Sequence, residues 1–279
     1  MADITAAQVK ELRDATNVSM MECKKALVES GGDKDKAMRL LREQGLAIAG
    51  KRAEKSANQG LITAEVLDGG AKGVMVEVNC ETDFVARNED FKKFVGDMLV
   101  AARDQKDGEL AAAMQDQLAD KIAAIGENII IRRNASFEVQ GTGAIASYIH
   151  LGGKIGILVE VGCENADTPS KDGFSELVRD ITLHIAASSP AYLKRDEVPA
   201  DVVDAEKAIF AKQAEGKPEN IIEKIVAGKV DKFYGQICLL EQAFVKDPDH
   251  SITQLLEAKG KEMGDTLSIR RYLRYQIGA

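Results

Sequence analysis

The stretch GLITAEVLDGGAKGVMVEVNCETDF, which runs from Gly60 to Phe84, decides the fold because the chain uses it twice. A second stretch, GAIASYIHLGGKIGILVEVGCENAD, starts at Gly143 and matches the first at a constant offset of 83 residues without a gap. In each stretch a glycine pair, Gly69–Gly70 or Gly152–Gly153, separates two runs of strand composition, which predicts a β-hairpin. An internal repeat of this length indicates one structural unit used twice.

The repeat continues beyond the hairpins. A helical pattern from Phe91, FKKFVGDMLVAA, lies over FSELVRDITLHI from Phe174. Each copy then ends on a matching strand, GENIIIRR from Gly126 and GDTLSIRR from Gly264. We therefore expect an α+β fold whose core is duplicated and built from antiparallel sheets with helices.

The first ~50 residues predict a small bundle of three short helices, which is similar to a ubiquitin-associated domain in outline only. Ser19 is placed to cap the second helix, and Asp33 to cap the third, which we expect to end at Gly45. The following LAIAGKRAEKSANQG is polar and basic. We interpret it as a linker or a frayed helix.

The second copy carries extra residues between its helix and its last strand, at roughly 190–240. Gly216 and Pro218 divide this segment into two runs with apolar residues at helical spacing, which predicts an inserted antiparallel helical hairpin. A projecting pair with an apolar stripe needs a surface to pack against, so we expect a self-association arm and a possible homodimer. The expected units are residues 1–55 for the N-terminal helices and basic linker, 56–140 for the first core copy, 141–189 with 241–279 for the second, and 190–240 for the hairpin.

Composition narrows the possible classes of protein. The 279 residues are 45% hydrophobic and 29% charged, with no apolar run long enough to span a bilayer, and the N-terminus has no signal-like apolar region. We expect a cytoplasmic protein that binds no membrane. Four cysteines without a CxxC pair and three histidines support neither a zinc cluster nor a disulfide framework, and we expect no metal or cofactor.

The net charge of −8 argues against nucleic acid as a partner. Two basic pairs, Arg132–Arg133 and Arg270–Arg271, lie at matching places in the two final strands. Because successive side chains of a strand point to opposite faces, we expect one arginine of each pair to lie against the sheet's neighbours and the other in solvent.

The corner after the second strand differs between the copies. NCETDFVARNEDF in the first copy stands where the second has GCENADTPSKDGF, so the fold closes this corner without the acid Asp83 or the aromatic Phe84. In a structural interpretation, Asp83 caps the following helix and Phe84 fills its base. In a functional one, the two residues protrude together and enter a partner, as aromatic anchors do at interfaces.

Several segments together resemble the bacterial elongation factor Ts family. The most specific are EVNCETDFVAR and LRDATNVSMMECKKAL from Leu12, and further segments fit as well: GENIIIRR, SYIHLGGKIGIL, HIAASSPAYL and IRRYLRYQIG. The resemblance covers essentially the whole chain. It implies a non-enzymatic guanine-nucleotide exchange factor for the translational GTPase elongation factor Tu.

The resemblance also implies the contact residues. The segment pressed against the GTPase to dislocate Mg²⁺ and release GDP, so that GTP can bind, would be Thr82, Asp83, Phe84 and Val85. Docking on the G domain would use Arg13, Met20, Met21 and Lys24, and contacts nearer the other domains would use His150 and Val245. Core packing is the alternative for the two methionines, and a strand-end histidine bonded to backbone is the alternative for His150.

Two other classes of function remain open from the residues alone. An enzyme would use Cys80 or Cys163 as nucleophile with His150 or His184 as base. Both cysteines lie at matching strand ends, which favours small buried residues over activated thiolates. The other class is an adaptor that holds the GTPase without promoting exchange, and only the pair Asp83 and Phe84 argues against it.

Overall fold

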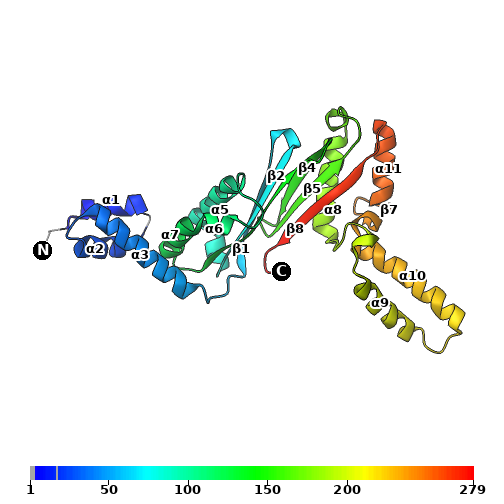
Figure 1. Ribbon diagram of the computed structural model, residues 1–279, viewed down its shortest axis with the longest axis horizontal. Helices are drawn as coiled ribbons and strands as arrows, with labels where there is room; N and C mark the ends of the chain where they lie inside the picture. Colours follow the sequence, from blue (N-terminus) through cyan, green and yellow to red (C-terminus); the bar gives the residue numbers. More distant parts are fainter. Residues whose placement is uncertain (1–3, 17) are drawn as a thin grey trace.

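The computed structural model describes residues 4–16 and 18–279. The molecule is elongated, with the N-terminal helices at one end, two sheets in the middle and a helical hairpin at the other end (Figure 1). The mixture of helices with small antiparallel sheets confirms the α+β fold class.

Three helices form the N-terminal bundle: α1 (Ala6–Thr16), α2 (Met20–Glu29) and α3 (Lys34–Arg52). The side chains of Ser19 and Asp33 accept hydrogen bonds from the first turns of α2 and α3, which confirms both predicted caps. The expected end of α3 at Gly45 is wrong. Gly45 lies inside the helix and faces α7 (Gln115–Ile125), where a Cβ would stand 3.4 Å from the Cβ of Ala123.

The two copies of the repeat form two antiparallel sheets, as expected. The first has the order β1 (Gln59–Leu67), β2 (Lys72–Cys80), β3 (Ile129–Glu138), and the second the order β4 (Gly143–His150), β5 (Ile155–Gly162), β8 (Ser268–Gln276). Gly60 pairs with Asn79 in one hairpin as Gly143 pairs with Gly162 in the other. The register also shifts at the same place in both copies, after Glu77 and after Glu160.

Helices cover one face of each sheet. On the first sheet these are α4 (Asp83–Arg87), α5 (Glu89–Ala102), α6 (Leu110–Ala113) and α7 (Gln115–Ile125), around a core that includes Phe91. On the second they are α8 (Phe174–Ser188) and α11 (Ile252–Met263), with the small strands β6 (Ala243–Phe244) and β7 (Asp247–Ser251). The hairpin consists of α9 (Ala200–Gln213) and α10 (Glu219–Ile237). The described residues also form four short 3₁₀ turns: η1 (Asp68–Gly70), η2 (Thr168–Ser170), η3 (Arg195–Glu197) and η4 (Leu239–Glu241).

The remaining faces of the two sheets pack against each other. The buried residues of this layer include three equivalent pairs from the two copies, namely Ile62 and Ile145, Met75 and Leu158, and Phe137 and Tyr275. Gly73 and Gly156, also equivalent, permit the close approach: a Cβ at Gly73 would lie 2.6 Å from Ile145 Cγ2, and one at Gly156 would strike Ile62 Cγ2, the equivalent atom, and lie 2.7 Å from Met75 Sδ. The two copies are therefore related by a local twofold symmetry.

Arginines cross between the sheets in the same symmetric way. Arg133 stacks over the ring of Tyr275 at 3.9 Å, and Arg271 stacks over the ring of Phe137 at 4.1 Å. Each arginine also bonds a fully buried glutamate of its own sheet at 2.7 Å, Glu77 in the first copy and Glu160 in the second.

The expected division of each arginine pair between sheet and solvent holds in the first copy, where Arg132 is exposed, and is wrong in the second, where both arginines are half-buried and bond Glu160. Arg132 lies 3.8 Å from Glu77, and Arg270 bonds Glu160 at 3.1 Å. Burial by itself would raise the pKa of the Glu160 carboxyl, but the N–H of Gln140 and the two arginines hold that pKa below its usual value. An acid at the same place in two apolar strands was the sequence signal for this pair of sites.

Candidate partner-binding site

The ETDF corner, Glu81–Phe84, leads from β2 into the five-residue helix α4. Phe84 is 80% exposed, although it is a large aromatic in a well-packed part of the fold. Asp83 is the first residue of α4 and pairs with Arg87 at 2.9 Å. An exposed aromatic beside a charge, on a short helix that ends a buried strand, is a feature of a binding surface.

The structural interpretation of this corner is wrong in both parts. Thr82, not Asp83, is the cap, because its hydroxyl accepts the N–H of Val85 at 3.3 Å. The base of α4 is filled by the partly buried Val85 and the buried Ala86, while Phe84 points away from that core. The sequence contained the signal for this cap, a threonine just before the helix.

The corner is fixed to the segment that precedes β3. The carboxylate of Glu127 accepts the N–H of Thr82 at 3.0 Å and its hydroxyl at 2.6 Å, while Glu81 accepts the N–H of Asn128 at 2.6 Å. Charge-assisted bonds of this kind hold a turn more firmly than neutral ones do. Glu127 was not anticipated from the sequence, and it places Phe84 on a rigid base.

The second copy keeps the same arrangement without the aromatic. Asp265 stands where the first copy has Glu127, and it accepts the N–H groups of Glu164 and Asn165 at 3.1 and 3.0 Å. The Thr168 hydroxyl, bonded at 2.5 Å, together with these N–H groups lowers the pKa of Asp265 to about 2. The clamp is thus a feature of the fold, whereas the exposed Phe84 belongs to one copy alone.

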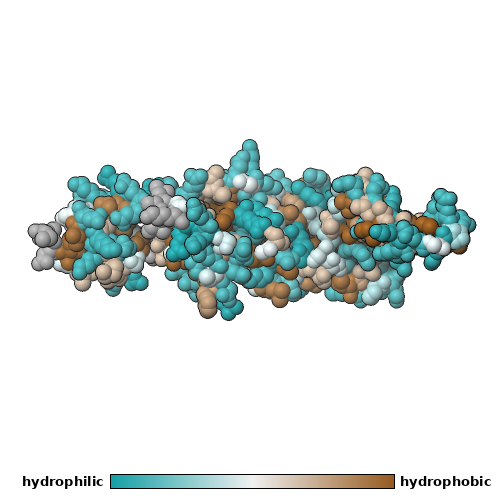
Figure 2. All heavy atoms as spheres, turned by 90° about the horizontal axis from the view of Figure 1, so that it is seen from below, coloured by the Kyte–Doolittle hydropathy of each residue, from teal (hydrophilic) through white to brown (hydrophobic). Residues whose placement is uncertain are grey.

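The candidate docking residues of the N-terminal helices are all exposed: Arg13 in α1 and Met20, Met21 and Lys24 in α2. The core-packing alternative for the methionines is wrong, because Met21 is 64% exposed and Met20 also lies in solvent, while Cys23 and Leu27 supply the inward face of α2. Figure 2 shows the apolar residues of this face in small patches along the whole length of the molecule.

His150 and Val245 both lie in the second copy. His150 ends β4, and its Nδ1 bonds the Tyr148 hydroxyl at 2.9 Å, so the alternative of a bond to backbone is wrong. Val245 is exposed in the turn between β6 and β7, and its N–H donates to Nδ1 of the buried His184 at 3.3 Å. Burial lowers the pKa of His184, which favours the neutral ring that this bond requires.

The structure does not bring these candidates into one cavity. The ETDF corner belongs to the first copy, the docking residues to the N-terminal helices, and His150 and Val245 to the second copy. Such a distribution suits contact with a large partner at several places along an elongated surface.

The cysteines do not have the environment of nucleophiles. Burial, together with the nearby carboxylate of Glu127, raises the pKa of the Cys80 thiol to about 12, and burial raises that of Cys163 as well. Their hydrogen bonds go to backbone carbonyls, at Thr82 and Asn165. Within the described parts of the chain, no hydrogen bond joins either thiol to His150 or His184, so the pairing that the enzyme hypothesis requires is not formed.

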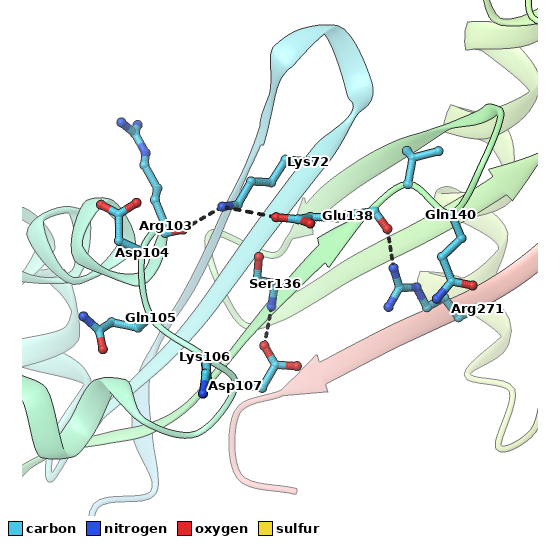
Figure 3. A pocket seen from close by; sticks show the side chains of 11 residues that line it. Lys72, Arg103, Asp104, Gln105, Lys106, Asp107, Ser136, Glu138, Gln140 and Arg271 are labelled. Atoms are coloured by element: carbon cyan, nitrogen blue, oxygen red, sulfur yellow. Dashed lines mark hydrogen bonds and ion pairs between the residues drawn. The ribbon is translucent and has the colours of Figure 1, made fainter.

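A polar hollow of about 730 Å³ lies where the loop after α5 meets the end of β3 (Figure 3). Two of its basic side chains are already engaged: Lys72 donates to the carbonyl of Arg103 at 2.7 Å and approaches Glu138, and Arg271 donates to the carbonyl of Glu138 at 2.6 Å. Asp107 likewise accepts the N–H of Ser136. Because these side chains bond other residues that line the hollow, we interpret the hollow as a structural junction between the two copies.

An apolar groove of about 510 Å³ lies between the two helices of the hairpin and is lined by Ile222, Val226 and Tyr234 among others. Ile209 and Ile221 are exposed on the same pair of helices. Over residues 4–16 and 18–279 there is no cluster of side chains suited to a metal ion, and no helix in that part of the chain is long and apolar enough to cross a membrane.

The sequence of the chain was compared with those of known proteins. Residues 81–279 match the family model described as Elongation factor TS. The chain is 46% identical to an elongation factor Ts of Trichlorobacter lovleyi over 99% of its own length and 93% of the relative's, and 44% identical to one of Syntrophotalea carbinolica over the same shares. One of Magnetococcus marinus is 43% identical over the same shares.

These similarities place the chain among translation elongation factors. The chain belongs to the elongation factor Ts family.

Proposed function

We propose that this protein is a guanine-nucleotide exchange factor that binds elongation factor Tu in its GDP form, dislocates Mg²⁺ and promotes release of GDP. The observation that carries the proposal is the 80% exposure of Phe84 on a corner clamped by Glu127. Membership of the elongation factor Ts family supports the choice of partner.

The chemistry needs no covalent step. A GTPase holds its nucleotide through a P-loop that cradles the phosphates and through Mg²⁺ that bridges the phosphates to a hydroxyl. Phe84 acts as a wedge between partner side chains, and Asp83 draws on polar groups that otherwise order the metal site. Displacing either support weakens nucleotide binding without breaking a bond, so this protein acts by coupling two binding equilibria and not as an enzyme.

The free energy needed to accelerate GDP release is more than Phe84 can supply alone. Each tenfold acceleration of release needs roughly 1.4 kcal/mol of selective destabilisation, and a factor of ten thousand needs about 5.5 kcal/mol. Phe84 therefore shares the work with the other contacts, at Thr82 and Val85, at the docking residues of α1 and α2, and at His150 and Val245. Coupling is reciprocal, so GTP entry weakens the complex by the same factor and frees the protein for another cycle.

The test is stopped-flow release of a fluorescent GDP analogue from elongation factor Tu. We expect Phe84→Ala to slow release at least about tenfold, while its stability changes by less than ~0.5 kcal/mol because the side chain is exposed. Asp167→Ala is the matched control, because Asp167 occupies the equivalent position in the second copy, and it should release GDP as fast as the native protein. Added Mg²⁺ should slow release if metal displacement is on the route.

Two results would contradict the proposal. If Phe84→Ala matches the native protein, exchange depends on another part of the surface. If the native protein binds elongation factor Tu but does not accelerate release, it is an adaptor.

We also propose that the hairpin is a self-association arm. Its apolar groove and the exposed Ile209 and Ile221 support this role, since apolar helical faces commonly pair with a second copy. Sedimentation of the native protein and of Ile221→Glu tests it: a dimer that dissociates in the variant supports the arm, and a native monomer at micromolar concentration contradicts it.

A further inference from the structure

The base of the ETDF corner is also the place where the N-terminal helices are attached. Asn128 is buried, and its side-chain Nδ2 donates to the carbonyl of Lys55 at 2.6 Å. Arg52, the last residue of α3, lies 3.4 Å from Glu81. The chain leaving the N-terminal helices is therefore bonded to two residues that also form the clamp.

A second contact joins the same two parts. α3 packs on α7 at Gly45 and Ala123, and Arg42 of α3 pairs with Asp116 of α7. α7 ends at Ile125, is capped by Gly126 in the left-handed conformation and leads directly into Glu127 and Asn128. The N-terminal helices and the corner that carries Phe84 thus rest on one continuous segment.

The second copy shows which part of this arrangement the fold itself requires. Thr266 stands where the first copy has Asn128, and it is exposed, with its N–H bonded to Asp265 at 2.6 Å. The corner still closes there around Asp265. The side-chain amide of Asn128 is therefore dispensable for the corner, and its one described hydrogen bond serves the linker.

We propose that Asn128 is a positioning residue that fixes the N-terminal helices relative to Phe84, so that the docking residues of α2 and the wedge reach the GTPase together. That the docking residues and Phe84 reach the GTPase together rests on the proposed function. Two contact sites on one rigid base bind with a higher effective concentration than two sites joined by a loose linker. The bond from Asn128 is well placed for this, because the linker between Arg52 and β1 is short and has no helix or strand of its own.

The first test needs no partner. Nitrogen-15 relaxation of the native protein should show the N-terminal helices reorienting with the sheets. In Asn128→Thr, where the α3–α7 packing and the Arg52–Glu81 contact still join the two parts, the helices should show added motion relative to the sheets. Thr266→Ser changes the equivalent corner without touching the linker and should behave as the native protein. Independent reorientation in the native protein, or no change in Asn128→Thr, would overturn the tether.

The second test measures GDP release as a function of factor concentration. Asn128→Thr should raise the half-saturating concentration about fivefold and leave the maximal rate within about twofold. In a Met21→Ala background the same substitution should have less than a twofold effect, because docking through α2 is already weakened. Additive effects of the two substitutions would overturn the link between tether and docking. If the native protein releases no GDP, the proposed function fails, and the relaxation result alone decides the tether.

Discussion

The layer between the two sheets predicts a large effect from a single methyl group. In Gly73→Ala the new Cβ would lie 2.6 Å from Ile145 Cγ2 and 3.2 Å from Leu158 Cδ2. Carbon atoms in favourable contact are about 3.5–4.0 Å apart, so Ile145 has to move by close to 1 Å. Both Ile145 and Leu158 are buried, so neither side chain can move into solvent to relieve the contact. We expect a loss of about 1–3 kcal/mol in the free energy of unfolding.

The assay is denaturant and thermal unfolding, in which each kcal/mol corresponds to roughly 2–4 °C in Tm for a chain of this size. Gly96→Ala is the matched control, because Gly96 is exposed inside α5 with open space around it. That substitution should stabilise by about 0.5–1 kcal/mol, through the better helix propensity of alanine.

A double-mutant cycle tests the cause. Ile145→Ala removes the methyl group that Gly73→Ala would strike, so the double variant should be at least about 1 kcal/mol more stable than additivity gives. The reasoning is refuted if Gly73→Ala changes stability by less than about 0.5 kcal/mol, or if the two changes add. The equivalent substitution Gly156→Ala, which would strike Ile62 as well as Met75, should cost a similar amount because of the local symmetry.

Three further outcomes are expected. The pKa of Asp265 is lowered to about 2 from 3.8, so the stability that its carboxylate provides is complete above about pH 5 and is lost as the pH falls toward 2. Asp265→Asn should flatten that part of an acid-unfolding curve, and an unchanged curve would contradict the clamp. Cys80, with a thiol pKa of about 12, should be alkylated at pH 8 at least about 100-fold more slowly in the native state than in denaturant, and comparable rates would reopen the enzyme hypothesis. Arg195 bonds Asp231 at 2.9 Å, pairs with Glu241 and stacks on the ring of Tyr234. Arg195→Ala should therefore speed amide hydrogen exchange in α10 by roughly 3- to 10-fold. Unchanged exchange would mean that these contacts do not hold the hairpin.

Local signals in the sequence were sufficient for much of the fold. The repeat and its glycine pairs located both β-hairpins, and Ser19 and Asp33 marked two helix starts, because these features depend on a few neighbouring residues. Gly45 misled the prediction, since a glycine also occurs inside a helix where it faces another helix, and that second helix lies far along the chain.

In the candidate site, too, local sequence signals could be interpreted and long-range contacts could not. The repeat singled out Asp83 and Phe84 as dispensable for folding, and the exposure of Phe84 agrees with that comparison. Glu127 and Asn128 could not be recognised, because their roles depend on bonds across more than forty residues of sequence. Long-range polar contacts of this kind have no periodicity for a sequence pattern to reveal.

The local twofold symmetry has an evolutionary consequence. A fused pair of equal units carries two corners, and each unit folds with a plain one, as Asp167 shows in the second copy. Selection could therefore alter one corner without losing the fold, and lengthen the other unit by a hairpin without disturbing the first. Each half of this fold can therefore carry its own addition, an exposed aromatic in one and a helical hairpin in the other, while equivalent residues of both halves form the layer between them.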